Sequence, residues 1–134
     1  MRLLNGAAIA RRLKAALRPR IARVTRRLGR PPGLALLACK AGTSAGLYFS
    51  RELNACREAG IAAREERVDP KRGAAALERR LQALSRDRRI DGILLEFPLP
   101  PTFDAQRVLA FLSPAKDIEG LTLENQGRLF GSKH

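Results

Sequence analysis

Two short apolar runs constrain the fold of this chain most. Gly33–Cys39 (GLALLAC) is apolar throughout, and Ile93–Phe97 (ILLEF) is apolar at all but one position. Runs of this kind are typical of strands that are covered on both faces, as in parallel sheets. Pro98 and Pro100 end the second run, because proline cannot donate to a strand ladder.

Helical periodicity surrounds these runs. Residues 7–28 carry one apolar stripe, whose members recur every three or four positions: Ile9, Leu13, Leu17, Ile21, Val24 and Leu28. Pro19 lies inside this segment and is expected to kink or divide the helix, since it lacks a backbone donor. A second helix is expected from about residue 47 to a cap at Gly60, and a third over residues 73–87.

The remaining segments give weaker signals. Ile61–Val68 is dominated by charged residues, so it is at most an edge strand. Asp104 or Thr102 can cap a short helix that runs through Leu112. Residues 113–134 have no clear periodicity and are interpreted as a functional loop or a docking segment. Strands and helices therefore alternate, which predicts an α/β domain with a small parallel sheet, flanking helices and right-handed crossovers.

The length and cysteine content favour one domain in a reducing compartment. The 134 residues are expected to form a single domain over 1–134. No apolar segment has membrane-spanning length and no secretory signal pattern is present, so a cytoplasmic protein is expected. Cys39 and Cys56 match no zinc or C-x-x-C pattern and are interpreted as reduced core residues.

The charge of the chain is strongly basic. It has 26 Lys and Arg against 13 Asp and Glu, a net charge of +13. This charge fits a polyanionic partner, but 21 of the basic residues are arginine, which equally indicates a compositional bias. Tyr48 is the only tyrosine and tryptophan is absent, so nucleic-acid binding is disfavoured. Residues 1–51 lack acidic residues, as transit peptides do, yet serine is absent before Ser44, which favours a solvated basic helix.

Ligands of open α/β sheets bind beyond the carboxyl ends of the strands. In this chain those ends lead into residues 40–48 and 96–100. The turn KAGTSAG between strand and helix fits neither G-x-x-x-x-G-K-[ST] nor G-x-G-x-x-G, so a simple connection is the favoured interpretation. Tyr48 and Glu52 are four residues apart and share one helix face, which makes them a candidate ligand pair.

Three separated motifs resemble one family. Ile90–Pro100 (IDGILLEFPLP) is similar to I-D-G-I-L-V-Q-L-P-L-P of the bifunctional methylenetetrahydrofolate dehydrogenase/methenyltetrahydrofolate cyclohydrolases. Pro114–Leu129 (PAKDIEGLTLENQGRL) resembles their P-x-K-D-V-D-G-x-x-x-x-N-x-G-R-L, and Leu47–Ile61 (LYFSRELNACREAGI) resembles their Y-x-x-x-K helix. The resemblance implies the amino-terminal catalytic domain of that family, which holds the folate in a cleft.

The resemblance also implies roles for single positions. Tyr48 matches the tyrosine that stacks on the pterin side of the folate. Glu52 stands where the family has the lysine of the cyclohydrolase step, and Glu96 stands where it has the assisting glutamine. Glu119 replaces the aspartate that holds the pterin edge. The substrate-binding residues implied are Tyr48, Glu119, Pro98 and Leu99, and the candidate catalytic residues are Glu52 and Glu96.

These replacements put the usual chemistry in doubt. Exchanging lysine for Glu52 reverses the charge and removes a proton donor, so the usual cyclohydrolase mechanism is expected to be lost or severely impaired. Ala45 also replaces a family serine. If the fold is kept, three carboxylates face one cleft. That cluster fits drift of an unselected site, altered folate chemistry with Glu52 or Glu96 as acid or base, or a hard divalent cation.

Redox chemistry is expected to need more than this chain. The family's nucleotide-binding domain is missing from the sequence and no G-x-G-x-x-G occurs, so no cofactor is expected in this chain, whereas the full-length family implies NADP or NAD. The sequence fits a fragment or a naturally short paralogue. The expected partners are a tetrahydrofolate derivative and a second copy or a separate nucleotide-binding domain. The alternative to an enzyme of one-carbon metabolism is an inactive descendant that binds folate or another protein.

Overall fold

The structure is a computed structural model that describes the backbone of residues 5–40 and 45–131 and the side chains of 5–40 and 49–131. The main elements follow one another along the chain as α1 (Gly6–Leu28), β1 (Gly33–Ala38), α2 (Ala45–Ala59), β2 (Ala62–Arg67), η1 (Pro70–Arg72), α3 (Ala74–Arg86), β3 (Gly92–Leu95), α4 (Ala105–Leu109) and α5 (Leu123–Gly131).

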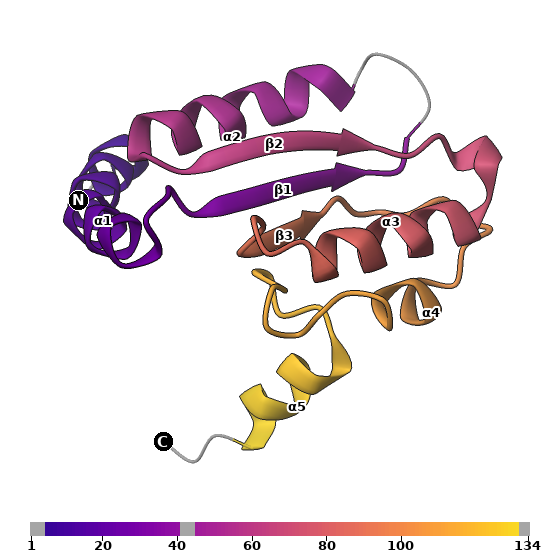
Figure 1. The fold of residues 1–134 in the computed structure, drawn as a ribbon. Helices are drawn as coiled ribbons and strands as arrows, with labels where there is room; N and C mark the ends of the chain where they lie inside the picture. Colours follow the sequence, from indigo (N-terminus) through magenta and orange to yellow (C-terminus); the bar gives the residue numbers. More distant parts are fainter. Residues whose placement is uncertain (1–4, 41–44, 132–134) are drawn as a thin grey trace.

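The strands form one parallel sheet in the order β2-β1-β3, with the apolar strand β1 in the centre. Helix α2 covers one face of this sheet, and α3 and α4 lie on the other (Figure 1). The predicted α/β architecture with a small parallel sheet and flanking helices is therefore confirmed.

The core explains why β1 is apolar without interruption. Leu36 and Ala38 pack with Phe49 of α2 on one face of the sheet. On the other face, Leu37 joins the cluster that contains Leu81 of α3. Because alternate residues of a strand point to opposite faces, a strand covered on both sides needs apolar residues at every position.

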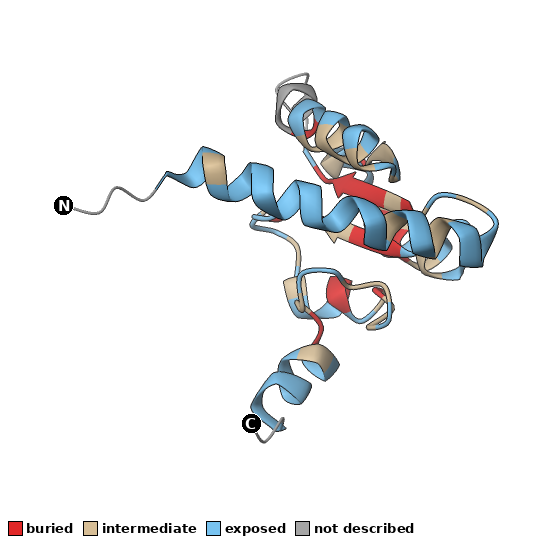
Figure 2. Ribbon diagram, turned by 90° about the vertical axis from the view of Figure 1, so that its left-hand side faces the viewer, coloured by how far each residue is buried: buried red, intermediate tan, exposed pale blue. Residues whose placement is uncertain are grey.

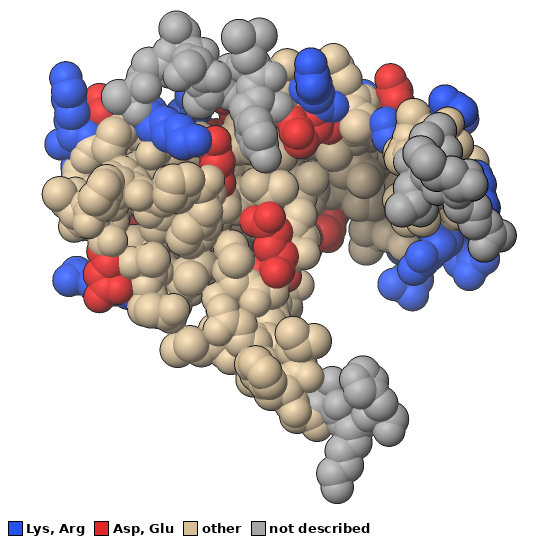
Figure 3. Space-filling model, turned by 180° about the vertical axis from the view of Figure 1, so that it is seen from behind, with Lys and Arg blue, Asp and Glu red and all other residues tan. Residues whose placement is uncertain are grey.

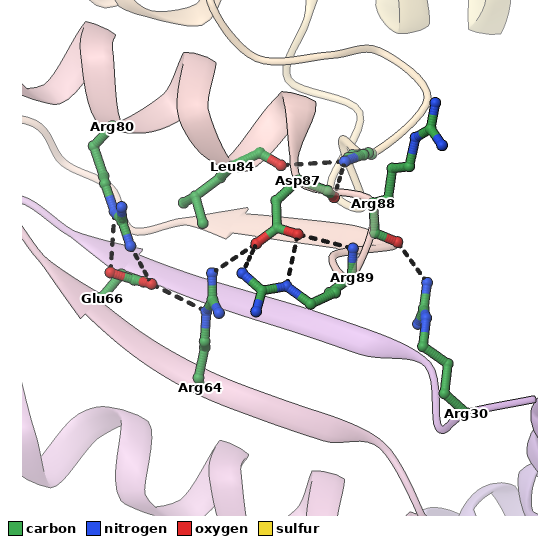
Figure 4. Close-up of polar contacts among 9 residues, drawn as sticks. Arg30, Arg64, Glu66, Arg80, Leu84, Asp87, Arg88 and Arg89 are labelled. Atoms are coloured by element: carbon green, nitrogen blue, oxygen red, sulfur yellow. Dashed lines mark hydrogen bonds and ion pairs between the residues drawn. The ribbon is translucent and has the colours of Figure 1, made fainter.

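The charged segment β2 is an edge strand, which was the only strand assignment its sequence allowed. Its carboxylate Glu66 accepts hydrogen bonds from Arg80 of α3, with Nη2 at 2.5 Å, and pairs with Arg64 Nε at 3.0 Å (Figure 4). Arg64 also reaches Asp87 at 3.4 Å, and Arg89 donates to the same carboxylate. These pairs let a polar strand lie against α3.

Helix α1 is continuous through Pro19, so the expected division does not occur. A proline removes one intrahelical hydrogen bond, and the turns on either side keep theirs. The apolar stripe is only partly covered: Ile9, Leu13 and Leu17 are 47%, 61% and 42% exposed. No residue of α1 is buried, and the helix extends past the body of the domain (Figure 2). None of the described helices is long and apolar enough to cross a membrane.

The carboxyl-terminal third departs most from the sequence-based expectations. Strand β3 ends at Leu95, two residues earlier than predicted, and α4 ends at Leu109, after which tighter i→i+3 turns continue to Leu112. Residues 123–131, interpreted as part of a loop, form helix α5. Thr122 Oγ1 accepts from the backbone of Asn125 at 3.4 Å and so caps this helix.

The two cysteines are free. Cys39 is buried, as predicted, whereas Cys56 is half-buried on α2. Burial raises the pKa of both thiols, so both favour the neutral form.

Candidate functional site

A hollow of about 190 Å³ lies at the carboxyl end of strand β3. It is lined by two of the segments that the sequence motifs supply: the end of β3 with the residues after it, and the loop before α5. The lining residues are Leu94, Leu95, Glu96, Phe97, Glu119 and Leu121. Of the predicted site residues, Glu96 and Glu119 are therefore brought together.

Glu96 is the first residue after β3. Its backbone N–H donates to the carbonyl of Leu37 at 2.9 Å, which continues the pairing with the central strand. Its side chain is only 8% exposed. Oε1 accepts a hydrogen bond from Lys40 Nζ at 2.5 Å, whereas Oε2 has no partner among the described residues. A buried carboxylate thus has one cationic partner and one oxygen left for another donor.

Glu119 is exposed and lies on a loop that Asp117 organises. Asp117 accepts hydrogen bonds from the backbone N–H groups of Leu121 at 3.1 Å and Thr122 at 2.8 Å, and from the Asn125 amide at 3.0 Å. Burial by itself would raise the pKa of Asp117, but these hydrogen bonds outweigh it and lower that pKa. The aspartate therefore stays ionised and holds the loop that carries Glu119.

Lys116, the residue before Asp117, fixes the other side of this loop. Its Nζ donates to the carbonyl oxygens of Leu84 at 3.1 Å and Asp87 at 2.7 Å, at the end of α3. The consecutive Lys and Asp of the motif Pro-x-Lys-Asp thus act as supports. They anchor the loop to the core and bring Glu119 to the strand ends.

Glu52 lies on α2 and is not part of the hollow's lining. Phe49 and Leu53, its neighbours on α2, pack against the sheet, so Glu52 is on or near the face of α2 that meets the strands. Its Oε2 is shielded from solvent and has no hydrogen-bond partner among the described residues. The expected cluster of three carboxylates is thus reduced to two in the hollow. In the part of the chain that the structure describes, no three Asp, Glu, His or Cys residues are placed to hold a metal ion.

The other predicted substrate-binding residues do not line the hollow. Leu99 belongs to the core, packed in the cluster with Val108, and Pro98 is exposed after a cis peptide bond. Tyr48 lies in α2, but its side chain is outside the described residues, as is that of Ala45. The turn over 41–44 is outside them too.

Sequence reasoning missed Lys40, Lys116 and Asp117 as parts of this site. The last two belong to a recognised motif, but only the hydrogen bonds show that they support the loop. Lys40 directly follows the buried Cys39 at the carboxyl end of β1, and this position was a usable signal. Its pairing with Glu96 depends on the register of two strands more than 50 residues apart, which spacing alone does not give.

Among the described residues, two other hollows of at least similar size lie elsewhere. One of about 190 Å³ lies between α4 and α5 and is lined largely by apolar residues such as Leu109, Leu112 and Leu123. Another of about 290 Å³ is lined by Arg67, Arg72, Arg79 and Arg80, two of which are already paired with glutamates. Neither contains Glu96 or Glu119, so the strand-end hollow is the better candidate for a functional site. From behind the sheet, Lys and Arg side chains gather over α1, and acidic side chains lie nearer the middle (Figure 3).

Comparison with known proteins agrees with the fold and the motifs. Residues 4–119 match the family model of the tetrahydrofolate dehydrogenase/cyclohydrolase catalytic domain. The fold is a three-stranded parallel sheet with a candidate site at its strand ends. The chain belongs to the tetrahydrofolate dehydrogenase/cyclohydrolase catalytic-domain family.

Curated relatives are bacterial bifunctional FolD proteins. The protein of Nitratidesulfovibrio vulgaris is 40% identical over 129 residues, which cover 96% of this chain and 45% of that protein. The protein of Paracidovorax citrulli is 36% identical over 127 residues, 95% of this chain and 44% of that protein. The chain therefore spans about half the length of the relatives it matches.

Solved structures give the same result. A methylenetetrahydrofolate dehydrogenase from the silkworm Bombyx mori superposes with a TM-score of 0.87 at 30% identity, over 96% of this chain and 44% of that one. The dehydrogenase-cyclohydrolase of Trypanosoma brucei, solved with NADP cofactor and an inhibitor, gives 0.85 at 27% identity, over 96% and 43%.

Proposed function

We propose that this domain binds a tetrahydrofolate derivative in the strand-end hollow and acts in one-carbon folate metabolism. The observation that carries the proposal is the meeting of Glu96 and Glu119 in one hollow. The family resemblance implies a role in the cyclohydrolase step for Glu96 and contact with the pterin edge for Glu119. The hollow also has apolar walls, from Leu94 and Leu121, which suit one edge of a flat ring.

The reaction within that class is the methenyltetrahydrofolate cyclohydrolase step, with water as the second reactant. The relatives that give this expectation are bifunctional, and one was solved with NADP. We propose that redox chemistry with NADP or NAD belongs to the part of the relatives beyond the matched half. The roles of Tyr48 and Glu119 in this proposal are those that the family resemblance implies: stacking on the folate for Tyr48, and acceptance of hydrogen bonds from the pterin edge for Glu119.

The second candidate function is that of an inactive descendant which binds folate, or another protein, without turnover. Glu52 favours this alternative, because the position belongs to a lysine in the family and a carboxylate cannot supply the same proton. Binding and hydrolysis must therefore be measured separately.

The test is a calorimetric titration of the 134-residue chain with a reduced folate. Glu119→Gln keeps the size of the side chain but removes the charge, and we expect it to weaken binding about tenfold, the value of one charge-assisted hydrogen bond. Glu124→Gln is the matched control, since Glu124 is on α5, pairs with Arg128 at 2.5 Å and does not line the hollow.

Saturable binding that Glu119→Gln weakens and Glu124→Gln leaves unchanged would support the proposal. A folded chain that gives no heat with any reduced folate would refute it.

A further inference from the structure

The carboxyl end of β1 places a lysine directly beside the strand-end hollow. Lys40 Nζ donates to Glu96 Oε1 at 2.5 Å, and Glu96 lines that hollow. We propose that Lys40 supplies the ammonium group that the helix position occupied by Glu52 no longer provides, so that it is a catalytic residue of the cyclohydrolase step. This inference rests on the folate function proposed above.

The strand alternation explains why the two groups meet. On β1, Leu36 and Ala38 face α2, and Lys40 is the next residue in that alternation. On β3, Leu94 packs on the same side, and Glu96 is next. Since β1 and β3 are parallel neighbours, both side chains leave the sheet at one edge and on one face.

The same layer contains Glu52. Helix α2 meets the sheet through Phe49 and Leu53, and Glu52 is next to Leu53 on this helix. An ammonium group at residue 40 and one at residue 52 would therefore both lie in the layer between α2 and the sheet. The first would enter this layer from the strand and the second from the helix.

Burial shows which member of the pair is anchored and which is available. The Glu96 side chain is 8% exposed, and the Lys40 side chain is 39% exposed. The carboxylate is thus held inside, and the ammonium head it fixes can still be reached from outside. A positioned but accessible cation is what a proton-transfer group requires.

The pairing also connects two replacements that look unrelated in the sequence. A neutral glutamine at residue 96 would need no cation, whereas a buried carboxylate without a cationic partner is costly. Lys40 supplies that partner. The exchange of lysine for Glu52 and the exchange of glutamine for Glu96 are then parts of one rearrangement, in which the ammonium has moved from the helix to the strand end.

The hydrolysis step balances with these groups. Water adds to the cationic bridge carbon between N5 and N10, so a carbon–oxygen bond forms and a water proton passes to Glu96. The bond from that carbon to N5 then breaks, its electron pair stays on N5, and N5 takes a proton from Lys40. The hydroxyl proton of the adduct is lost as the formyl group forms. Glu96 returns its proton to Lys40, so 10-formyltetrahydrofolate and one released proton are the products.

The test follows methenyltetrahydrofolate hydrolysis spectroscopically, with folate binding measured on the same samples. Lys40→Gln should lower the rate about 100-fold or more, the usual value of a general acid–base group, and change the dissociation constant much less. Lys40→Arg keeps a cation for Glu96 but does not release its proton near neutrality, so it should remain folded and lose the same rate.

A rescue separates catalysis from a structural role. The double variant Lys40→Gln with Glu52→Lys should hydrolyse methenyltetrahydrofolate at least about tenfold faster than Lys40→Gln alone, since the ammonium group is returned to the helix. The matched control is Lys40→Gln with Glu58→Lys, because Glu58 is also on α2 but its side chain is 64% exposed and pairs with Lys14. This control should regain nothing.

The outcomes distinguish the two proposals. If the wild-type chain binds folate but does not hydrolyse it, or if Lys40→Arg hydrolyses it at the wild-type rate, the role of Lys40 is refuted and folate binding stands. Equal rescue by Glu58→Lys would likewise refute the role. If the wild-type chain binds no folate, the proposed function itself fails and the role of Lys40 fails with it.

Discussion

The ionisation of Asp91 is tied directly to the fold. Its carboxylate accepts hydrogen bonds from Arg30, with Nη1 at 2.6 Å and Nη2 at 3.0 Å, and from the backbone of Gly33 at 2.7 Å. The hydrogen bond from Arg30 is the main cause of the lowered pKa of Asp91. Asp91 therefore joins the start of β1 to the turn before β3 in its ionised form.

A pH series on Asp91→Asn tests this link. Because the folded-state pKa is lowered, the carboxylate stabilises the fold above its unfolded pKa of about 3.9, and the effect disappears as the pH falls through the folded value. We expect the variant to lose about 0.5–1 kcal/mol at pH 6, a value reduced for solvent screening of a half-exposed pair. As the pH falls below about 4, the difference in free energy of unfolding between the wild-type protein and Asp91→Asn should close.

Urea unfolding of both proteins from pH 3 to 7 measures the effect. A stability difference between the two proteins that is constant across this range would show that the charge of Asp91 does not cause the difference. Glu124→Gln, which removes one exposed ion pair within α5, should leave stability unchanged at every pH.

At the residue scale, the sequence predicted two residues that the structure brings together, whereas the roles of the predicted site residues stay predictions. Glu96 and Glu119 were identified from the resemblance of two motifs to the family, and the structure brings both to one hollow. The family resemblance implied a substrate contact for Leu99, and the structure places its side chain in the core. The ion pair of Lys40 with Glu96 could not be predicted, because it depends on the pairing of β1 with β3.

The helices differ in how much stability they can contribute. Leu81 of α3 is fully buried in the main core, whereas Leu13 of α1 is 61% exposed. Leu81→Ala should therefore lower the free energy of unfolding by about 2–5 kcal/mol, through lost burial and the cavity left behind. Leu13→Ala should change it by less than about 0.5 kcal/mol.

Chemical denaturation of the two variants measures this difference, and the same leucine-to-alanine change makes them a matched pair. A large loss at Leu13 would mean that α1 packs against something that the exposed stripe does not show. A small loss at Leu81 would contradict the position of α3 on the sheet.

At the element scale, periodicity predicted the long segments and failed on the short polar ones. The helices over 6–28 and 74–86 and the central strand followed from apolar spacing. Strand β2 could only be assigned as an edge, because its residues are mostly charged and its place follows from pairing with β1. Helix α5 contains Asn125 and Gly127, which weaken any helical signal, and its cap depends on the fold of the preceding loop.

In the whole molecule, much of the basic charge lies away from the candidate site. The net charge of +13 includes eight Lys and Arg on α1, a helix with no buried residue. The candidate site is instead at the carboxyl ends of β1 and β3 and contains two glutamates in its lining. The basic surface thus says little about what the candidate site binds, and the parallel sheet indicates where that site lies.

The measurement that tests this account most directly is backbone NMR shift mapping of the chain during titration with a reduced folate. We expect saturable shifts at Glu96, Phe97 and the Glu119–Leu121 loop, and none at Leu109 or Leu112 in the hollow beside α4. Shifts confined to the α4 hollow or to α1, or none at all in the folded protein, would contradict the placement of folate at the strand ends.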